Sequence, residues 1–227
     1  MASGAEPGSR EKILDVAEAL FARRGYAGVG LREVADAVGL GKSSLFHHFR
    51  GKSQLYFEVL FGALARIRAR LEPVLADRGD PLQRLLRWVD TLVDAFAEHP
   101  TSARLLLRAL VEDETPREAL RSEAERAEAI LDATLEGVRR LLREGIAAGA
   151  FRPVSDAHTV QTLIGATVYH FASGELGEGL LGGPLLSAEA VARRKQELRE
   201  LLRSGLAAAS PGHPPSPAST EGRRWRS

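Results

Sequence analysis

The chain of 227 residues contains no cysteine. That absence excludes disulfide frameworks, thiolate metal sites and cysteine nucleophiles. The sequence also lacks the apolar N-terminal segment of a signal peptide and any run of eighteen apolar residues that could cross a membrane. Nucleotide-binding loops, dinucleotide fingerprints, nucleophile elbows and HExxH zinc motifs are missing as well. We therefore expect a cytoplasmic protein that is not an enzyme, with no cofactor, metal or membrane partner.

Hydrophobic residues make up 44% of the chain and charged residues 27%, which is typical of a folded globular protein. The net charge is only +1, but it is unevenly distributed. Residues 1–52 and the tail 210–227 are each slightly basic, whereas the segment between them is acidic. A basic N-terminal segment followed by an acidic segment indicates, weakly, a partner that carries phosphate.

The pattern of apolar residues predicts helices throughout, because no segment shows sustained strand alternation and Ala, Leu, Arg and Glu dominate. Asp80-Pro81 is an N-cap with proline at the first helical position, and an apolar stripe follows it. A long helix from Lys52 is expected to end or kink before Pro73. Residues 1–8 are predicted to be flexible. The proline-rich tail 210–227 has too few apolar residues to fold and is predicted to be disordered.

A helix over residues 157–173 stands out because residues 157–174 carry no charge. One face is apolar, and the opposite face, with Thr162, Gly165 and Tyr169, is also uncharged. Such a helix is covered on both sides. We therefore predict a homodimer interface, formed with the last helix, by Val160, Leu163, Ile164, Thr167, Val168, Phe171, Val191, Leu198 and Leu202. The alternative is that this is the central helix of a monomeric bundle.

The segment Leu31–Lys52 predicts two short helices separated by a glycine-containing turn, which is a helix-turn-helix. Gly39 can supply the positive φ that the turn requires. The second helix would expose short polar donors and aromatic rings that suit a DNA groove: Lys42, Ser43, Ser44, Phe46 and His47. From this pattern alone, an ordinary corner between two helices remains an equal alternative.

Residues 9–60 closely resemble the DNA-binding domain of the tetracycline-repressor (TetR) family of transcriptional regulators. The first helix ends in the family's F-x-x-x-G-Y pattern, at Phe21, Gly25 and Tyr26. The matches continue over Leu31 to Ala35, over Gly39 to Phe49 and at Lys52. Phe46-His47-His48-Phe49 is the most recognisable part of the resemblance.

The resemblance implies a role for each matching residue. Lys42, Ser43 and Ser44 lie where the family meets base edges in the major groove, and Phe46 replaces the usual tyrosine. His47, His48 and Lys52 lie at positions that contact phosphate or lock the helices together. Gly30 stands where the family often has Thr or Ser, so a phosphate contact there would lack its side chain.

For the whole chain, the resemblance implies an all-α protein with a three-helix head, residues 9–52, and a larger helical body, residues 53–209. The body would dimerise and bind a small-molecule effector. The implied function is a ligand-responsive repressor that binds a palindromic operator in double-stranded DNA as a homodimer. The alternatives are an activator with the same head, or a constitutive DNA-binding or protein-interaction module without an inducer. An internal apolar cavity in the body would favour the sensor.

Candidate ligand contacts in the body rest on residue type and spacing. Two aromatic residues lie on or beside an apolar stripe, two arginines share a helix face at i, i+4 spacing, and a Tyr-His pair follows on an uncharged helix. These candidates are Trp88, Phe96, Arg104, Arg108, Tyr169 and His170. Each has a simpler interpretation, as core for the aromatics, as a solvated surface pair for the arginines, or as hydrogen-bonded buried groups for Tyr169 and His170. Adjacent His47 and His48 point about 100° apart on a helix, so we expect no metal site there.

Overall fold

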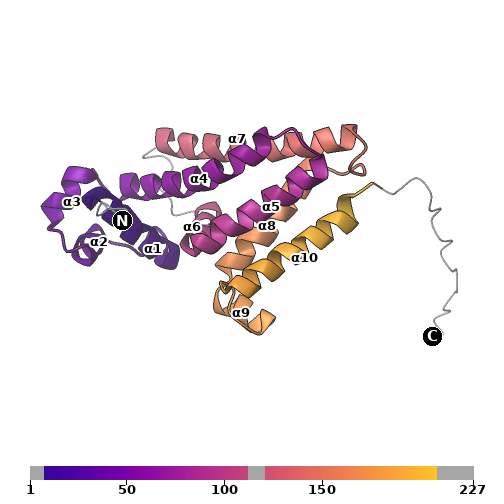
Figure 1. Cartoon of the computed structure of the whole chain (residues 1–227). Coiled ribbons are helices and arrows are strands. Elements are labelled where there is room, and N and C mark those ends of the chain that lie inside the picture. Colours follow the sequence, from indigo (N-terminus) through magenta and orange to yellow (C-terminus); the bar gives the residue numbers. More distant parts are fainter. Residues whose placement is uncertain (1–7, 112–120, 209–227) are drawn as a thin grey trace, which may run out of the picture.

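The computed structural model describes residues 8–111 and 121–208 (Figure 1). The predictions for residues 1–7 and for the tail from 209 onward lie outside these ranges. The described ranges contain ten helices and one isolated β-bridge, between Phe151 and Ala207, so the predicted all-α class is confirmed. The helices are α1 (Ser9–Arg24), α2 (Leu31–Ala37), α3 (Lys42–His48), α4 (Lys52–Ala76), α5 (Pro81–Glu98), α6 (Pro100–Val111), α7 (Arg121–Ala147), α8 (Asp156–Ala172), α9 (Glu175–Leu181) and α10 (Ala188–Leu206).

The helices enclose two hydrophobic cores. The head core joins α1–α3 to the first half of α4, with Phe21, Leu45, Phe49 and Tyr56 among its fully buried side chains. The body core joins the second half of α4 to α5, α7, α8 and α10. Figure 1 shows the head at one end of the molecule, with α4 running from it along α7. Both cores therefore rest on the same long helix.

The sequence predicted that the helix from Lys52 ends or kinks before Pro73. Helix α4 does not end there but continues to Ala76. A proline within a helix costs one backbone hydrogen bond and strains the preceding turn. Here Leu71 is buried, and Val74 and Leu75 pack against the body core on either side of the proline. Burial of these side chains stabilises the last turn enough to offset the lost hydrogen bond.

The residues predicted for the dimer interface lie in or beside the core of their own chain. Seven of them are buried in the single chain, namely Val160, Leu163, Thr167, Val168, Phe171, Leu198 and Leu202. The other two, Ile164 and Val191, are partly buried and pack against the body core. The opposite face of α8 is the exposed one: Thr162 and Gly165 are exposed, and Tyr169 is 55% exposed. Spacing identified the apolar stripe correctly but could not say which layer covers it.

None of the described helices is long and apolar enough to cross a membrane.

Candidate DNA-binding helices and ligand cavity

Helices α2 and α3 pack as a helix-turn-helix. Gly39 takes a φ of +71° in the turn, and the Leu40 amide donates a hydrogen bond of 2.9 Å to the Ala35 carbonyl. Val34 and Leu45 are fully buried between the helices. The positive φ is the conformation for which glycine is favoured at this position. The packing of the pair expected from the sequence is confirmed.

Helix α3 exposes the side chains expected to meet DNA. Ser43, His47 and His48 are exposed, Phe46 is 43% exposed, and Ser44 is half-buried. Lys42 is the first residue of α3, and its side chain lies outside what the structure describes. The structure thus brings the described candidates together on one short helix. Their contacts with base edges remain a prediction.

Lys52 and Gly30 lie beside the helix-turn-helix. Lys52, the first residue of α4, donates from Nζ to the Ala27 carbonyl at 3.2 Å and lies 4.4 Å from the centroid of the Tyr26 ring. These contacts tie the start of α4 to the loop before α2, which agrees with a helix-locking position. Gly30 is the exposed N-cap residue of α2 and provides no side-chain hydrogen bond to the helix.

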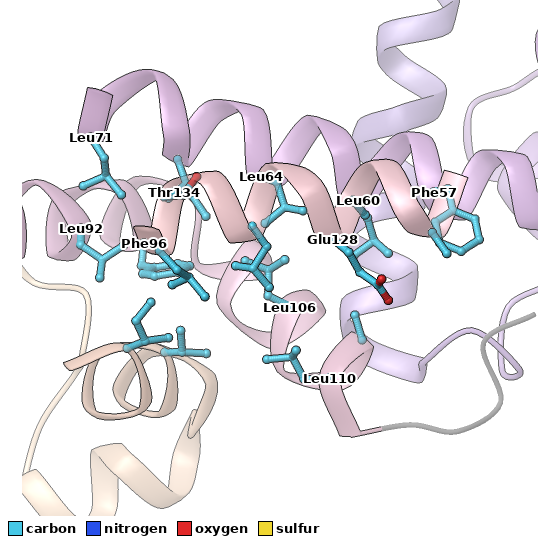
Figure 2. A pocket seen from close by; sticks show the side chains of 18 of the residues that line it. Phe57, Leu60, Leu64, Leu71, Leu92, Phe96, Leu106, Leu110, Glu128 and Thr134 are labelled. Atoms are coloured by element: carbon cyan, nitrogen blue, oxygen red, sulfur yellow. The ribbon is translucent and has the colours of Figure 1, made fainter. Parts of the chain in front are cut away.

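An apolar cavity of about 300 Å³ lies between α4, α5, α6, α7 and α8 and is partly open to the surface. Figure 2 shows Leu60, Leu64 and Leu106 pointing toward the same space from α4 and α6. Of the predicted ligand residues, Trp88 and Phe96 line this cavity, and so do Ile164 and Val168 from the predicted interface. The indole N–H of Trp88 is buried and has no hydrogen-bond acceptor within the described chain. A volume of this size is sufficient for a small ligand.

The other predicted ligand residues do not line this cavity. Arg104 and Arg108 lie on the side of α6 that meets α1, where Arg108 donates to the carbonyls of Ala22 at 3.1 Å and Arg23 at 3.3 Å. Tyr169 points outward. Because Leu106, Ala109 and Leu110 are the α6 residues in the cavity wall, the arginines lie on another face of the same helix.

His170 is buried against the Phe171 ring rather than exposed to a ligand. Burial, and secondarily the nearby Arg194 guanidinium, lower the pKa of His170 to about 4. Its imidazole is therefore neutral at physiological pH. The structure buries this side chain, as the simpler interpretation expected, but it does not show the expected hydrogen bond, because Nε2 has no partner in the described chain.

Sequence reasoning missed most of the cavity wall. Leu60 and Leu64 on α4 and Leu131 and Leu135 on α7 line it at i, i+4 spacing. That spacing is visible in the sequence, but it is the same for a leucine that fills a core and for one that borders a cavity. Only the distance between the helices distinguishes the two.

A buried carboxylate connects the head to the cavity walls, and it too was not predicted. Glu18 of α1 is 7% exposed and accepts three hydrogen bonds. The donors are Arg66 of α4 at 2.6 Å, Thr101 of α6 at 3.0 Å and Ser102 of α6 at 2.8 Å. Helices α4 and α6, which wall the cavity, are thus both bonded to a helix of the head.

Comparison with known proteins finds matching families for both the head and the body. Residues 13–59 match the family described as bacterial regulatory proteins, tetR family. Residues 81–202 match the tetracyclin repressor-like C-terminal domain, which by itself covers more than half of the chain.

Two relatives and one solved structure extend this similarity. The chain is 30% identical to the transcriptional repressor KstR2 of Mycolicibacterium smegmatis, over 72% of this chain and 78% of the relative. It is 31% identical to the transcriptional repressor AcnR of Corynebacterium glutamicum, over 79% of this chain and 91% of the relative. The structure of the ketosteroid transcriptional regulator KstR2 of Mycobacterium tuberculosis superposes with a TM-score of 0.73 at 24% identity, covering 92% of this chain and 100% of that one. The chain therefore belongs to the TetR family of bacterial regulatory proteins and is a DNA-binding transcriptional regulator.

Proposed function

We propose that this regulator is a ligand-responsive repressor that binds a palindromic operator as a homodimer and releases it when an effector fills the body cavity. The observation that carries this proposal is the shared use of α4 and α6. Both helices line the cavity, and both hold Glu18 of the head. A ligand that changes the separation of α4 and α6 therefore shifts the residues that hydrogen-bond to Glu18, and with them the position of α1.

The release mechanism depends on the spacing of the two heads. Recognition helices of a dimer read two half-sites about 34–36 Å apart, one turn of DNA. A small rotation of each head on its body breaks that spacing. The effector must bind the released state more tightly than the DNA-bound state, because only differential affinity shifts the equilibrium.

Within the head, we assign base reading to Lys42, Ser43 and Ser44, with Phe46 beside them on α3. His47 and His48 are assigned to phosphate contacts. Lys52 acts mainly by fixing the start of α4 against the loop at Ala27. Base contacts discriminate between sequences, whereas phosphate contacts raise the affinity for all DNA.

The dimer interface that we now propose is the exposed face of α8 together with the neighbouring face of α10. Thr162, Gly165 and Tyr169 form an uncharged surface on α8, and Leu201 of α10 is 63% exposed. A Cβ added at Gly165 would meet no atom within 4 Å, so the helix surface is open there. An open uncharged surface of this kind suits close packing against a second copy.

The cavity predicts the chemical character of the effector. Its described lining is apolar except for Trp88, Glu128 and Thr134, and Glu128 is an exposed side chain. The effector of this chain is accordingly a largely apolar molecule. The KstR2 structure described above belongs to a regulator named for ketosteroids, which is in keeping with an apolar ligand in this fold.

The test starts by sequencing the genomic fragments that the purified protein retains, which identifies the operator. Operator release is then measured by fluorescence anisotropy with progesterone and 1-decanol as apolar probes. Leu106→Trp fills the cavity, and Leu180→Trp, at an 81% exposed position on α9, is the matched control. We expect at least one probe to release DNA from the wild type and the control but not from Leu106→Trp.

Release that is equal in all three proteins would place the effector elsewhere. No release by either probe, with a body that binds neither, would favour a constitutive DNA-binding module. A reporter gene behind the operator gives the sign of regulation, because deletion of the regulator raises expression for a repressor and lowers it for an activator.

A further inference from the structure

A second cavity of about 300 Å³ lies where the head meets the body, and it shares no lining residue with the first. Its walls come from α1 of the head and from α6, α8, α9 and the segment after α9. Among its lining residues are Arg23, Thr101, Arg104, Phe171, Glu178 and Leu185. A ligand in this cavity would touch both parts of the protein.

The guanidinium groups of two arginines in this cavity have no partner among the described residues. The guanidinium groups of Arg23 of α1 and Arg104 of α6 make no hydrogen bond or ion pair with any residue that the structure describes, and Arg23 is an exposed residue. The contrast with Arg108, one turn further along α6, is informative, because Arg108 donates to two carbonyls of α1. Arg104 is also only partly exposed, so its guanidinium lacks both a protein acceptor and full solvation.

The backbone makes room for the Arg104 guanidinium. Gly174, between α8 and α9, has a φ of +55°, and a Cβ added there would lie 2.6 Å from Arg104 Nη2. Glycine is therefore favoured at residue 174 both for its backbone conformation and for the space it leaves. The guanidinium is held against the turn that begins α9, inside the cavity.

The remaining lining defines what could bind beside the two cations. Phe171 and Leu185 are almost fully buried, and Ala19, Pro100 and Leu186 add further apolar surface. Glu178 is the acidic residue of the lining and is exposed on α9. The nearby Glu18 carboxylate is already engaged by Arg66, Thr101 and Ser102. The cavity thus combines two unpaired guanidiniums with a compact apolar wall.

We propose that this junction is a second binding site, for a small organic carboxylate with a compact apolar body. The carboxylate lies between Arg23 and Arg104, where guanidinium groups offer paired N–H donors that match its two oxygens. The apolar body lies against Phe171 and Leu185. Because Arg23 belongs to the head and Arg104 to the body, the bound carboxylate cross-links them. This proposal does not depend on the function of the first cavity.

Isothermal titration calorimetry on the full chain tests the site with three probes that share parts of one structure. Phenylacetate has both the carboxylate and the apolar ring, acetate lacks the ring, and phenethylamine carries the opposite charge. We expect binding in the order phenylacetate, then acetate, with none for phenethylamine. Equal affinity for acetate and phenylacetate, or no phenylacetate binding at 10 mM, would overturn the proposal.

Removing a positive or a negative charge from the cavity should change the affinity for phenylacetate in opposite directions. Arg104→Gln should weaken phenylacetate binding about tenfold or more, because a hydrogen bond between charged groups contributes roughly 1.5–3 kcal/mol and 1.4 kcal/mol is tenfold. Arg104→Lys should give an intermediate loss, since it keeps the charge but not the paired donors. Glu178→Gln should strengthen binding. Arg32→Gln, at an exposed residue of α2, is the matched control and should leave the affinity unchanged.

Two results would reject the site. One is unchanged phenylacetate affinity in Arg104→Gln when its melting temperature equals that of the wild type. The other is loss of binding in Leu106→Trp, which would place phenylacetate in the first cavity. We expect Arg104→Gln to fold normally because the side chain makes no hydrogen bond or ion pair to the described chain.

Discussion

Replacing Glu18 with alanine removes the buried acceptor that joins α1 to α4 and α6. The Ser102 hydroxyl, in a residue that is 1% exposed, loses its 2.8 Å hydrogen bond to the carboxylate. An orphaned buried polar group costs about 1–3 kcal/mol. The Arg66 side chain is 38% exposed and can be hydrated, so its lost ion pair adds less than about 1 kcal/mol. Together these contributions span about 1–4 kcal/mol, and we expect Glu18→Ala to lower the free energy of unfolding by an amount near the middle of that range, about 2–3 kcal/mol.

The assay is urea denaturation of the wild type, Glu18→Ala, Ser102→Ala and the double variant at one protein concentration. For a domain of this size, 2–3 kcal/mol corresponds to a melting temperature lower by about 4–12 °C. The double variant should lose less than the sum of the single variants, because Ser102→Ala removes the hydroxyl that Glu18→Ala leaves without its acceptor. A Glu18→Ala protein within about 0.5 kcal/mol of the wild type would refute this account of the head–body contact.

Three further predictions follow from the exposed, buried and DNA-facing positions. Tyr169→Arg should stay folded but run as a monomer in light scattering, whereas Val168→Arg should fail to fold, because an unpaired charge in the core costs several kcal/mol. As pH falls from about 6.5 to about 4, the wild type should lose stability that His170→Gln does not lose, because the unfolded histidine takes up a proton before the buried one with its lowered pKa. Ser44→Ala should lower the preference for operator over scrambled DNA by roughly 1–3 kcal/mol, whereas Lys52→Ala should weaken both equally and lower the melting temperature.

Each of these predictions has a result that would contradict it. A dimeric Tyr169→Arg would remove the exposed face of α8 from the interface. Parallel stability curves for the wild type and His170→Gln between pH 4 and 6.5 would show that this histidine titrates alike in both states. Equal losses on operator and scrambled DNA for Ser44→Ala would exclude it from base reading.

The sequence by itself determined the helical class and the helix-turn-helix. Helix periodicity, the cap at Asp80 and the glycine at residue 39 are local properties of the chain, and local properties can be inferred without knowing the neighbours. The long motif from Leu31 to Lys52 also identified the family, because it combines core spacing, turn chemistry and surface residues in a single stretch.

Only the tertiary structure decided which side of each helix faces which partner. The apolar stripe on α8 is the same pattern whether its own bundle or a second subunit covers it, and Val168 and Phe171 proved to lie inside the chain. Likewise, Arg104 and Arg108 share a helix face in sequence, yet Arg108 bonds the end of α1 while Arg104 lies in the junction cavity. The two cavities and the Glu18 hydrogen bonds join residues more than forty positions apart, and the order of residues along a chain does not specify which distant side chains the packing of helices brings together.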